Sequence, residues 1–227
     1  MRKQIVFYKG GLLRFVGHLD LMRTIQRALR RANIPLAYSQ GFNPHPLLSF
    51  ASPLALGWTG EREICEIKLE TDMEDTVLLE KLSKELPTGL KLLSCREISD
   101  QEPSAMAKMA AAAYRIGLPD GPDWHRHLTE LMNEPSIMIE KMGKVHGRKR
   151  LVQADIKPLI YQCNLEDSNT LYLLCACGSE KNLKPDLLIK VLYERAGKPE
   201  LLYSETITRL ELFTESSDGY QAFTAED

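Results

Sequence analysis

The sequence predicts an α+β protein made of two tandem ferredoxin-like units, each with the order βαββαβ and an antiparallel sheet. Strand-like alternation and helical periodicity follow each other in the same order in both halves of the chain. The 227 residues, 44% hydrophobic and 26% charged, suffice for two small cores. The expected domains are residues 1–100 and 114–213, joined by a linker at 101–113 and followed by a flexible tail at 214–227.

In the first half, the clearest prediction is a helix over residues 19–32. Its apolar side chains recur every three or four residues and form one stripe, while its arginines fall on the opposite face. Strands are predicted on both sides of it from alternating apolar residues. The remaining expected elements are strands at 4–8, 47–51, 63–69 and 90–98, with a second helix at 75–86.

The second half repeats this order with one inserted hairpin. Strands are expected at 112–118, 161–165, 171–177 and 202–212, and helices at 123–133 and 184–195. Between the first of these helices and the strand pair, residues 136–160 form a long extended stretch. It contains a basic cluster punctuated by Gly143 and Gly147, which indicates a hairpin tip or mobile loop. The members of this cluster are Lys141, Lys144, His146, Arg148, Lys149 and Arg150.

Charge is distributed unevenly along the chain. The net charge is only -2, but residues 1–60 carry eight lysines and arginines against one acidic residue, Asp20, whereas residues 61–140 carry seventeen acidic and nine basic residues. This separation predicts a positive and a negative face and favours an anionic partner for the positive one. A solvated helix face, neutralised by the acidic segment, is the alternative.

The basic residues of the first 60 residues and the basic cluster within 136–160 are therefore candidates for RNA binding. The loop at 38–46 adds aromatic and amide groups beside the arginine stripe, a combination suited to unpaired bases. Core packing is the alternative for both aromatic side chains, and it is the favoured one for Phe42. The candidate RNA-binding residues are Arg14, Arg23, Arg27, Arg30, Arg31, Tyr38, Phe42, Asn43, Lys141, Lys144, Arg148, Lys149 and Arg150.

His18, Asp20 and His45 are candidates for acid/base chemistry, because two histidines and a carboxylate flank the basic helix. Capping of the helix and of the loop by these side chains is the favoured alternative. No third ligand stands at a recognisable spacing, so no metal is assigned. Five scattered cysteines without a CxxC pair are read as buried thiols, and no cofactor is expected.

The segment from Lys9 to Arg23, KGGLLRFVGHLDLMR, is followed by RALRRA at 27–32 and YSQGFNPHP at 38–46. Together these motifs resemble the radical-SAM-linked protein family, a bacterial group encoded beside or fused to cobalamin-binding-type radical SAM proteins. A weaker match is Ala154–Pro158. Gly17 departs from the serine that this family more commonly has before the histidine, which costs a helix cap a few tenths of a kcal/mol.

The resemblance implies a radical SAM protein as partner, which would carry the radical chemistry. Combined with the basic clusters, it leads to the expectation of a non-enzymatic RNA-binding accessory to an enzyme acting on RNA or a ribosomal component. A cytoplasmic location is expected because the N-terminal residues lack a signal-peptide core and no apolar stretch could span a membrane. An RNA-processing or RNA-modifying enzyme using His18 and His45 is the first alternative, and a protein-docking module without RNA is the second. No DNA partner is expected. A membrane is not expected either, because no apolar stretch is long enough to span one.

Overall fold

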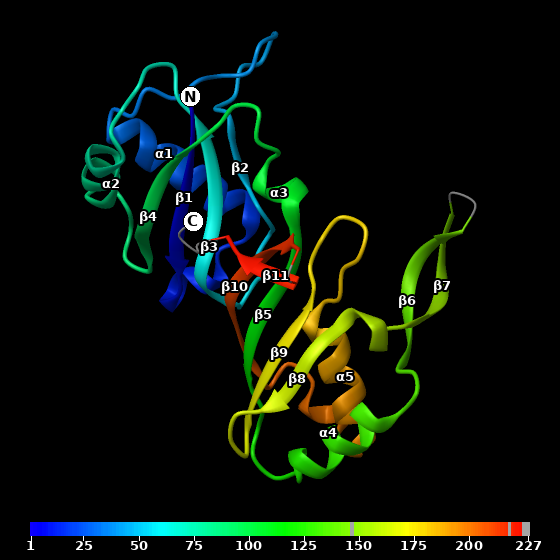
Figure 1. Cartoon of the computed structure of the whole chain (residues 1–227). Helices are drawn as coiled ribbons and strands as arrows, with labels where there is room; N and C mark the ends of the chain where they lie inside the picture. The colour runs from blue at the N-terminus through cyan, green and yellow to red at the C-terminus, as the bar shows by residue number, and fades with distance from the viewer. Residues whose placement is uncertain (146–147, 218, 224–227) are drawn as a thin grey trace. The chain divides into compact units, whose positions relative to one another are not determined.

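The computed structural model describes residues 1–145, 148–217 and 219–223, and it confirms an α+β architecture with mostly antiparallel strands (Figure 1). The chain divides into two compact units. The first contains residues 1–110 and the described part of 208–227, and the second contains residues 111–207. Within the described residues, no helix is both long and apolar enough to cross a membrane.

The first unit has the predicted order βαββαβ. Its elements are β1 (Arg2–Lys9), the 3-10 helix η1 (Gly11–Phe15), α1 (His18–Arg31), β2 (Leu48–Phe50), β3 (Thr59–Lys68), α2 (Asp75–Ser83) and β4 (Leu90–Ile98). Strand β1 lies between β4 and β3, β2 pairs with β3, and all three pairings are antiparallel. Later in the chain, β10 (Thr206–Ser216) runs parallel to the start of β3, and β11 (Gly219–Ala222) pairs with β10.

The core of this unit lies between the sheet and its helices. Alternate residues of β1 and β3, such as Ile5 and Ile67, are buried against the apolar stripe of α1, where Ile25 and Leu29 are at most 4% exposed. The arginines of α1 lie on the opposite, exposed face, as the periodicity predicts. Helix α1 begins after Gly17, which makes no side-chain capping bond.

Residues 101–113, expected to be a linker, contain regular structure. They form the short helix α3 (Ala105–Lys108) and the start of β5 (Met109–Gly117). Ser104 caps α3 by accepting from Ala107 N at 3.3 Å, and Ala105 N donates to the Glu66 carboxylate at 2.8 Å. This polar contact with β3 holds the start of α3 to the first unit.

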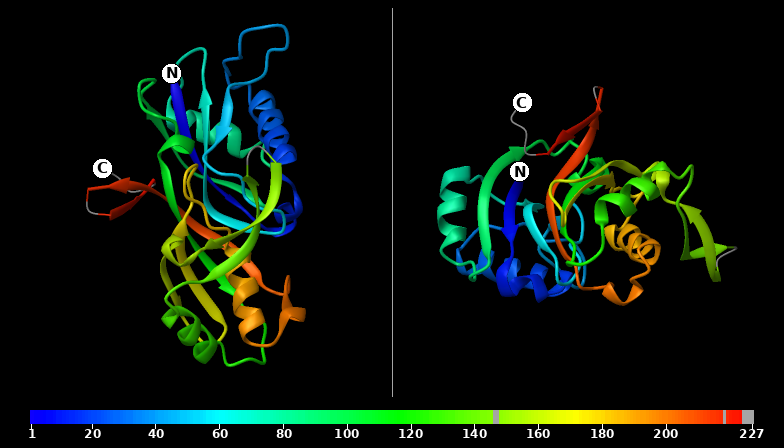
Figure 2. Two further views of the ribbon diagram at one scale, coloured as in Figure 1. Left: turned by 90° about the vertical axis from the view of Figure 1, so that its right-hand side faces the viewer. Right: turned by 90° about the horizontal axis from the view of Figure 1, so that it is seen from below.

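The second unit is built on the antiparallel strand order β5-β9-β8. Its further elements are α4 (Trp124–Asn133), β6 (Met138–Val145), β7 (Arg148–Asp155), η2 (Lys157–Leu159), β8 (Ile160–Leu165), β9 (Thr170–Ala176), α5 (Pro185–Arg195) and η3 (Pro199–Leu201). Helices α4 and α5 meet through Trp124 and Tyr193, whose ring centroids are 5.3 Å apart. Figure 2 shows the β6–β7 hairpin standing away from these two helices.

The boundaries at the C-terminal end differ from those expected. Residues 208–213, assigned to the second domain from the sequence, group with the first unit, because β10 pairs there with β3. The expected tail contains the end of β10 and the strand β11, and Phe223 is 5% exposed. Ser216 is the last residue of β10 and pairs with Gly219 of β11, so regular structure continues into the region expected to be frayed. The tandem ferredoxin-like description of the whole chain stays a prediction.

All five cysteines are free thiols, and burial raises the pKa of Cys95 and of Cys163 to about 12. We expect folded protein at pH 8 to react with a thiol-specific disulfide reagent more than about 100-fold slower than unfolded protein, because little thiolate is present. Absorbance of the released thiol measures this, and the same reaction in denaturant, where all five thiols react, is the control. Rapid labelling of two or more thiols in the folded protein would contradict the prediction.

Candidate functional site

The four candidate arginines of α1 are all exposed, but they are not equivalent. Arg23 donates to Asp20 at 3.0 Å, and Arg31 donates to both the side chain and the backbone carbonyl of Glu85. For Arg27 and Arg30, the described part of the chain shows no ion pair. The latter two are therefore the arginines of α1 that are available to an external anion.

The loop between β1 and α1 is fixed by its backbone. Gly10 N donates to Gly89 O at 2.9 Å, and Arg14 O accepts from Gly57 N at 2.8 Å. Gly89, at a φ of 99°, is required here, because a Cβ would lie 2.6 Å from Gly10 O. The exposed Arg14 guanidinium lies 4.7 Å from the centre of the Phe15 ring. Arg14 thus presents its charge from a fixed loop of the same unit as α1.

The loop at 38–46 projects beyond the end of α1 (Figures 1 and 2). Phe42 lies on this projecting loop and is fully exposed, so the expectation that it packs in the core is wrong. Tyr38 is 38% exposed, and Asn43 is exposed as well. The loop therefore offers an aromatic face and an amide to a ligand.

The three candidate acid/base residues each have a local contact. The His18 ring meets the Phe50 ring edge-on at a centroid distance of 5.2 Å, Asp20 pairs with Arg23, and His45 Nδ1 lies 2.9 Å from Ser39 Oγ. Contacts among the described residues join none of these three side chains to another. The described residues also contain no group of three or more His, Cys, Asp or Glu side chains suited to a metal ion.

The basic cluster of the second unit lies on the β6–β7 hairpin. Lys141 is half-buried and Arg150 is exposed. The remaining members, Lys144, Arg148 and Lys149, lie where the structure describes the strands but not the side chains, and His146 falls outside the described residues. The hairpin is thus established, while the contribution of its charges to RNA binding stays a prediction.

Sequence reasoning missed a buried charge cluster in the first unit. Arg209 on β10 donates to both carboxylate oxygens of Glu63 on β3 and to Ser52 Oγ at 3.1 Å. Lys9 is 1% exposed, and its ammonium group has a long bond, 3.4 Å, to Arg14 O. Burial lowers the pKa of Lys9, while the Glu63 charge opposes that shift. The cluster lies beneath the loop that carries Arg14.

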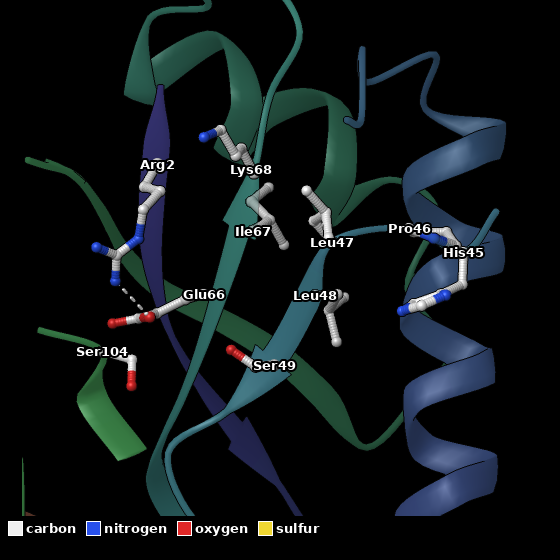
Figure 3. A pocket seen from close by; sticks show the side chains of 10 residues that line it. All are labelled: Arg2, His45, Pro46, Leu47, Leu48, Ser49, Glu66, Ile67, Lys68 and Ser104. Carbon is white, nitrogen blue, oxygen red and sulfur yellow. Dashed lines mark hydrogen bonds and ion pairs between the residues drawn. The ribbon is translucent and has the colours of Figure 1, made fainter. Parts of the chain in front are cut away.

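A second feature not predicted from the sequence is an open pocket of about 340 Å³ in the first unit. Figure 3 shows the Arg2 and Glu66 side chains pointing toward each other, with Ser104 close to the Glu66 carboxylate. Arg2 Nη2 and Glu66 Oε2 are 2.8 Å apart. Ser49 on β2, the register partner of Glu66, and Leu47, which precedes β2, line another side of the pocket. His45 and Pro46 of the projecting loop complete the lining.

A family described as "Uncharacterized protein conserved in bacteria (DUF2344)" matches residues 2–185. The chain belongs to this family. The DUF2344 match spans α1, the projecting loop, the pocket and the β6–β7 hairpin, and it ends before Arg209. The buried charge cluster therefore joins residues inside the matched region with one outside it. Both candidate basic clusters lie inside the matched region.

No curated protein matches this DUF2344 member. Among solved structures, the crystal structure of an unknown protein from Galdieria sulphuraria aligns with 92% of this chain and 96% of that chain at 11% sequence identity. The TM-score is 0.27, too low for any conclusion about fold or function. The functional interpretation therefore depends on the geometry of this chain.

Proposed function

We propose that this protein binds single-stranded RNA through its first unit, as a non-enzymatic accessory to a radical SAM enzyme that acts on RNA or a ribosomal component. The observation that carries the proposal is the combination of two exposed arginines on α1, Arg27 and Arg30, which form no ion pair with the described residues, and a fully exposed aromatic ring on the loop that projects beyond α1. Arginines neutralise phosphates and an exposed ring stacks on a base, which are the two contacts that single-stranded nucleic acids require.

The accessory role is supported by a separate set of exposed apolar side chains. Leu12 is 86% exposed and Phe15 57%, both on η1, while Leu19 and Leu56 are each 64% exposed. The hydrogen bond from Gly57 to Arg14 joins the two loops that carry most of them. Exposed apolar patches on rigid elements are typical of protein contact surfaces. That the partner is a radical SAM protein rests on the motif resemblance alone.

Phe42→Ala is expected to weaken binding of a 12-nucleotide single-stranded RNA about tenfold, because one stacked base contributes about 1–3 kcal/mol. The dependence of affinity on salt should stay unchanged, since the ring carries no charge. Fluorescence anisotropy titrations at several salt concentrations measure both quantities. Tyr203→Ala, which removes an aromatic side chain 84% exposed in the second unit, is the matched control.

An equal effect of Phe42→Ala and Tyr203→Ala, or no RNA binding by the wild-type protein, would refute the proposed function. Incubating the same samples with RNA also tests the enzymatic alternative. Reproducible cleavage or modification that His18→Ala or His45→Ala slows by about 100-fold would replace the accessory role with acid/base catalysis.

A further inference from the structure

We propose that the pocket between β2, β3 and the start of α3 receives one unpaired base of the bound RNA, and that it selects a base presenting N–H donors, guanine above all. This inference rests on the proposed function, because RNA supplies the base. The volume of the pocket, about 340 Å³, is in the range of small-molecule sites, about 300–1,000 Å³. The inference deepens the proposed function by assigning a base preference to the first unit.

The ionic groups of the pocket already satisfy each other, which favours an uncharged ligand over a phosphate. Arg2 donates to Glu66 Oε2 at 2.8 Å and also to the backbone carbonyl of Ser99 at 3.1 Å and to that of Glu102. Lys68, also in the lining, lies 3.4 Å from Asp100. A phosphate would have to displace these partners, whereas a neutral base would leave them in place.

Glu66 is the group that would read the base. Its side chain is 7% exposed and is held by Arg2 on one oxygen and by Ala105 N on the other. An ionised carboxylate has about four acceptor positions, so two remain after these bonds. Guanine presents adjacent N1–H and N2–H donors that match two carboxylate oxygens. Uracil presents one N–H between two carbonyl oxygens, which a carboxylate repels.

The rest of the lining suits a flat, partly polar ring. Leu47 and Pro46 provide apolar surface, while the hydroxyl groups of Ser49 and Ser104 can donate to a base carbonyl oxygen. Ser49 lies on the same sheet face as Glu66, its register partner. Pro46 also belongs to the loop that carries Phe42, so a base stacked on Phe42 and a neighbouring base in the pocket would contact one continuous segment.

The test is a comparison of guanosine and uridine 5′-monophosphates, which carry the same charge. Each is titrated into the wild-type protein while the methyl NMR signals of Leu47 and Ile67 are followed. We expect the guanosine compound to shift these signals and to bind at least about fivefold more tightly. Equal affinities for the two compounds, or shifts confined to other parts of the protein, would overturn the inference without any variant.

Ser49→Phe, which fills the pocket, should abolish the guanosine-specific shifts, whereas Ser94→Phe on the exposed side of β4 should not. Retained discrimination in a folded Ser49→Phe protein would also overturn the inference. The two proposals fail separately. RNA binding that depends on Phe42, without discrimination between the two monophosphates, refutes the pocket alone. Discrimination by a protein that does not bind RNA refutes RNA binding and, with it, the assignment of the base to RNA.

Discussion

Replacing Glu63 with glutamine is expected to lower the free energy of unfolding by about 3–5 kcal/mol. The Glu63 carboxylate is the counter-charge of two buried cations, because Arg209 donates to both of its oxygens and its charge also acts on Lys9. Glutamine keeps the shape of the side chain but leaves both cations buried without a carboxylate. Urea unfolding at pH 7, followed by circular dichroism, measures the change.

Two further variants calibrate this result. Arg209→Met should cost less than Glu63→Gln, because Lys9 remains to offset the Glu63 charge. Glu134→Gln is the matched surface control: its partner Arg195 lies at 2.8 Å and is 55% exposed, so the loss should stay below about 1 kcal/mol. A Glu63→Gln effect no larger than that of Glu134→Gln would contradict a stabilising role for the cluster.

The pH dependence of the stability of the Glu63→Gln variant tests whether the buried charge of Lys9 causes part of its instability. A lysine whose pKa is lower in the folded than in the unfolded state penalises folding while it is protonated. Stability therefore rises as the pH rises through the folded-state pKa, and the gain is complete above the unfolded value of about 10.4. We expect the Glu63→Gln variant to recover part of its lost stability when the pH is raised to 9.5. We also expect the double variant Glu63→Gln/Lys9→Met to be more stable at pH 7 than Glu63→Gln alone. Equal instability of both variants at both pH values would exclude Lys9.

The double variant Arg27→Gln/Arg30→Gln is expected to weaken RNA binding about 10- to 30-fold near 0.1 M salt and to flatten its salt dependence. Each phosphate contact with single-stranded RNA adds about 0.7 to the slope of log affinity against log salt, so two lost contacts lower it by about 1.4. Both side chains lie opposite the apolar stripe of α1, so folding should persist. Anisotropy titrations from 50 to 300 mM salt give both values.

Arg115→Gln/Arg195→Gln is the matched control, because it removes the same two charges from exposed ion pairs of the second unit. Adding Arg23→Gln and Arg31→Gln to the α1 variant should reduce affinity by a smaller further factor, since Asp20 and Glu85 already neutralise these arginines. An unchanged affinity and slope in the double variant, or the same change in the control, would remove α1 from the RNA interface.

The arginine face of α1 is the part of the candidate site most accessible to sequence reasoning. A helical period of 3.6 residues places Ile25 and Leu29 on one side and Arg27 and Arg30 on the other, whatever surrounds the helix. The hairpin at 138–155 was likewise indicated by glycines within a basic, extended segment. Phe42 was not predictable in the same way, because its exposure depends on whether another element covers the projecting loop.

The buried charge cluster and the pocket could not be predicted from the sequence in this way. Glu63 and Arg209 are 146 residues apart and meet at 2.8 Å only because β10 returns to pair with β3. Glu66 looks in the sequence like one polar residue of an alternating strand, yet it is buried and accepts a hydrogen bond from Ala105 N, in the segment expected to be a linker. A charged residue inside an otherwise apolar strand is the signal that points to such sites, but it does not name the partner.

The sequence by itself determined the α+β class, the helical face that carries the arginines and the βαββαβ order of the first unit, because each follows from periodicities that can be read element by element. Tertiary structure alone decided that residues 208–213 join the first unit, that Glu85 neutralises Arg31, and that Arg2, Ser49, Glu66 and Ser104 surround one pocket. The physical reason is that hydrogen bonds and ion pairs act over about 3 Å in space, irrespective of distance along the chain. Folding brings residues that are far apart in the sequence within that range.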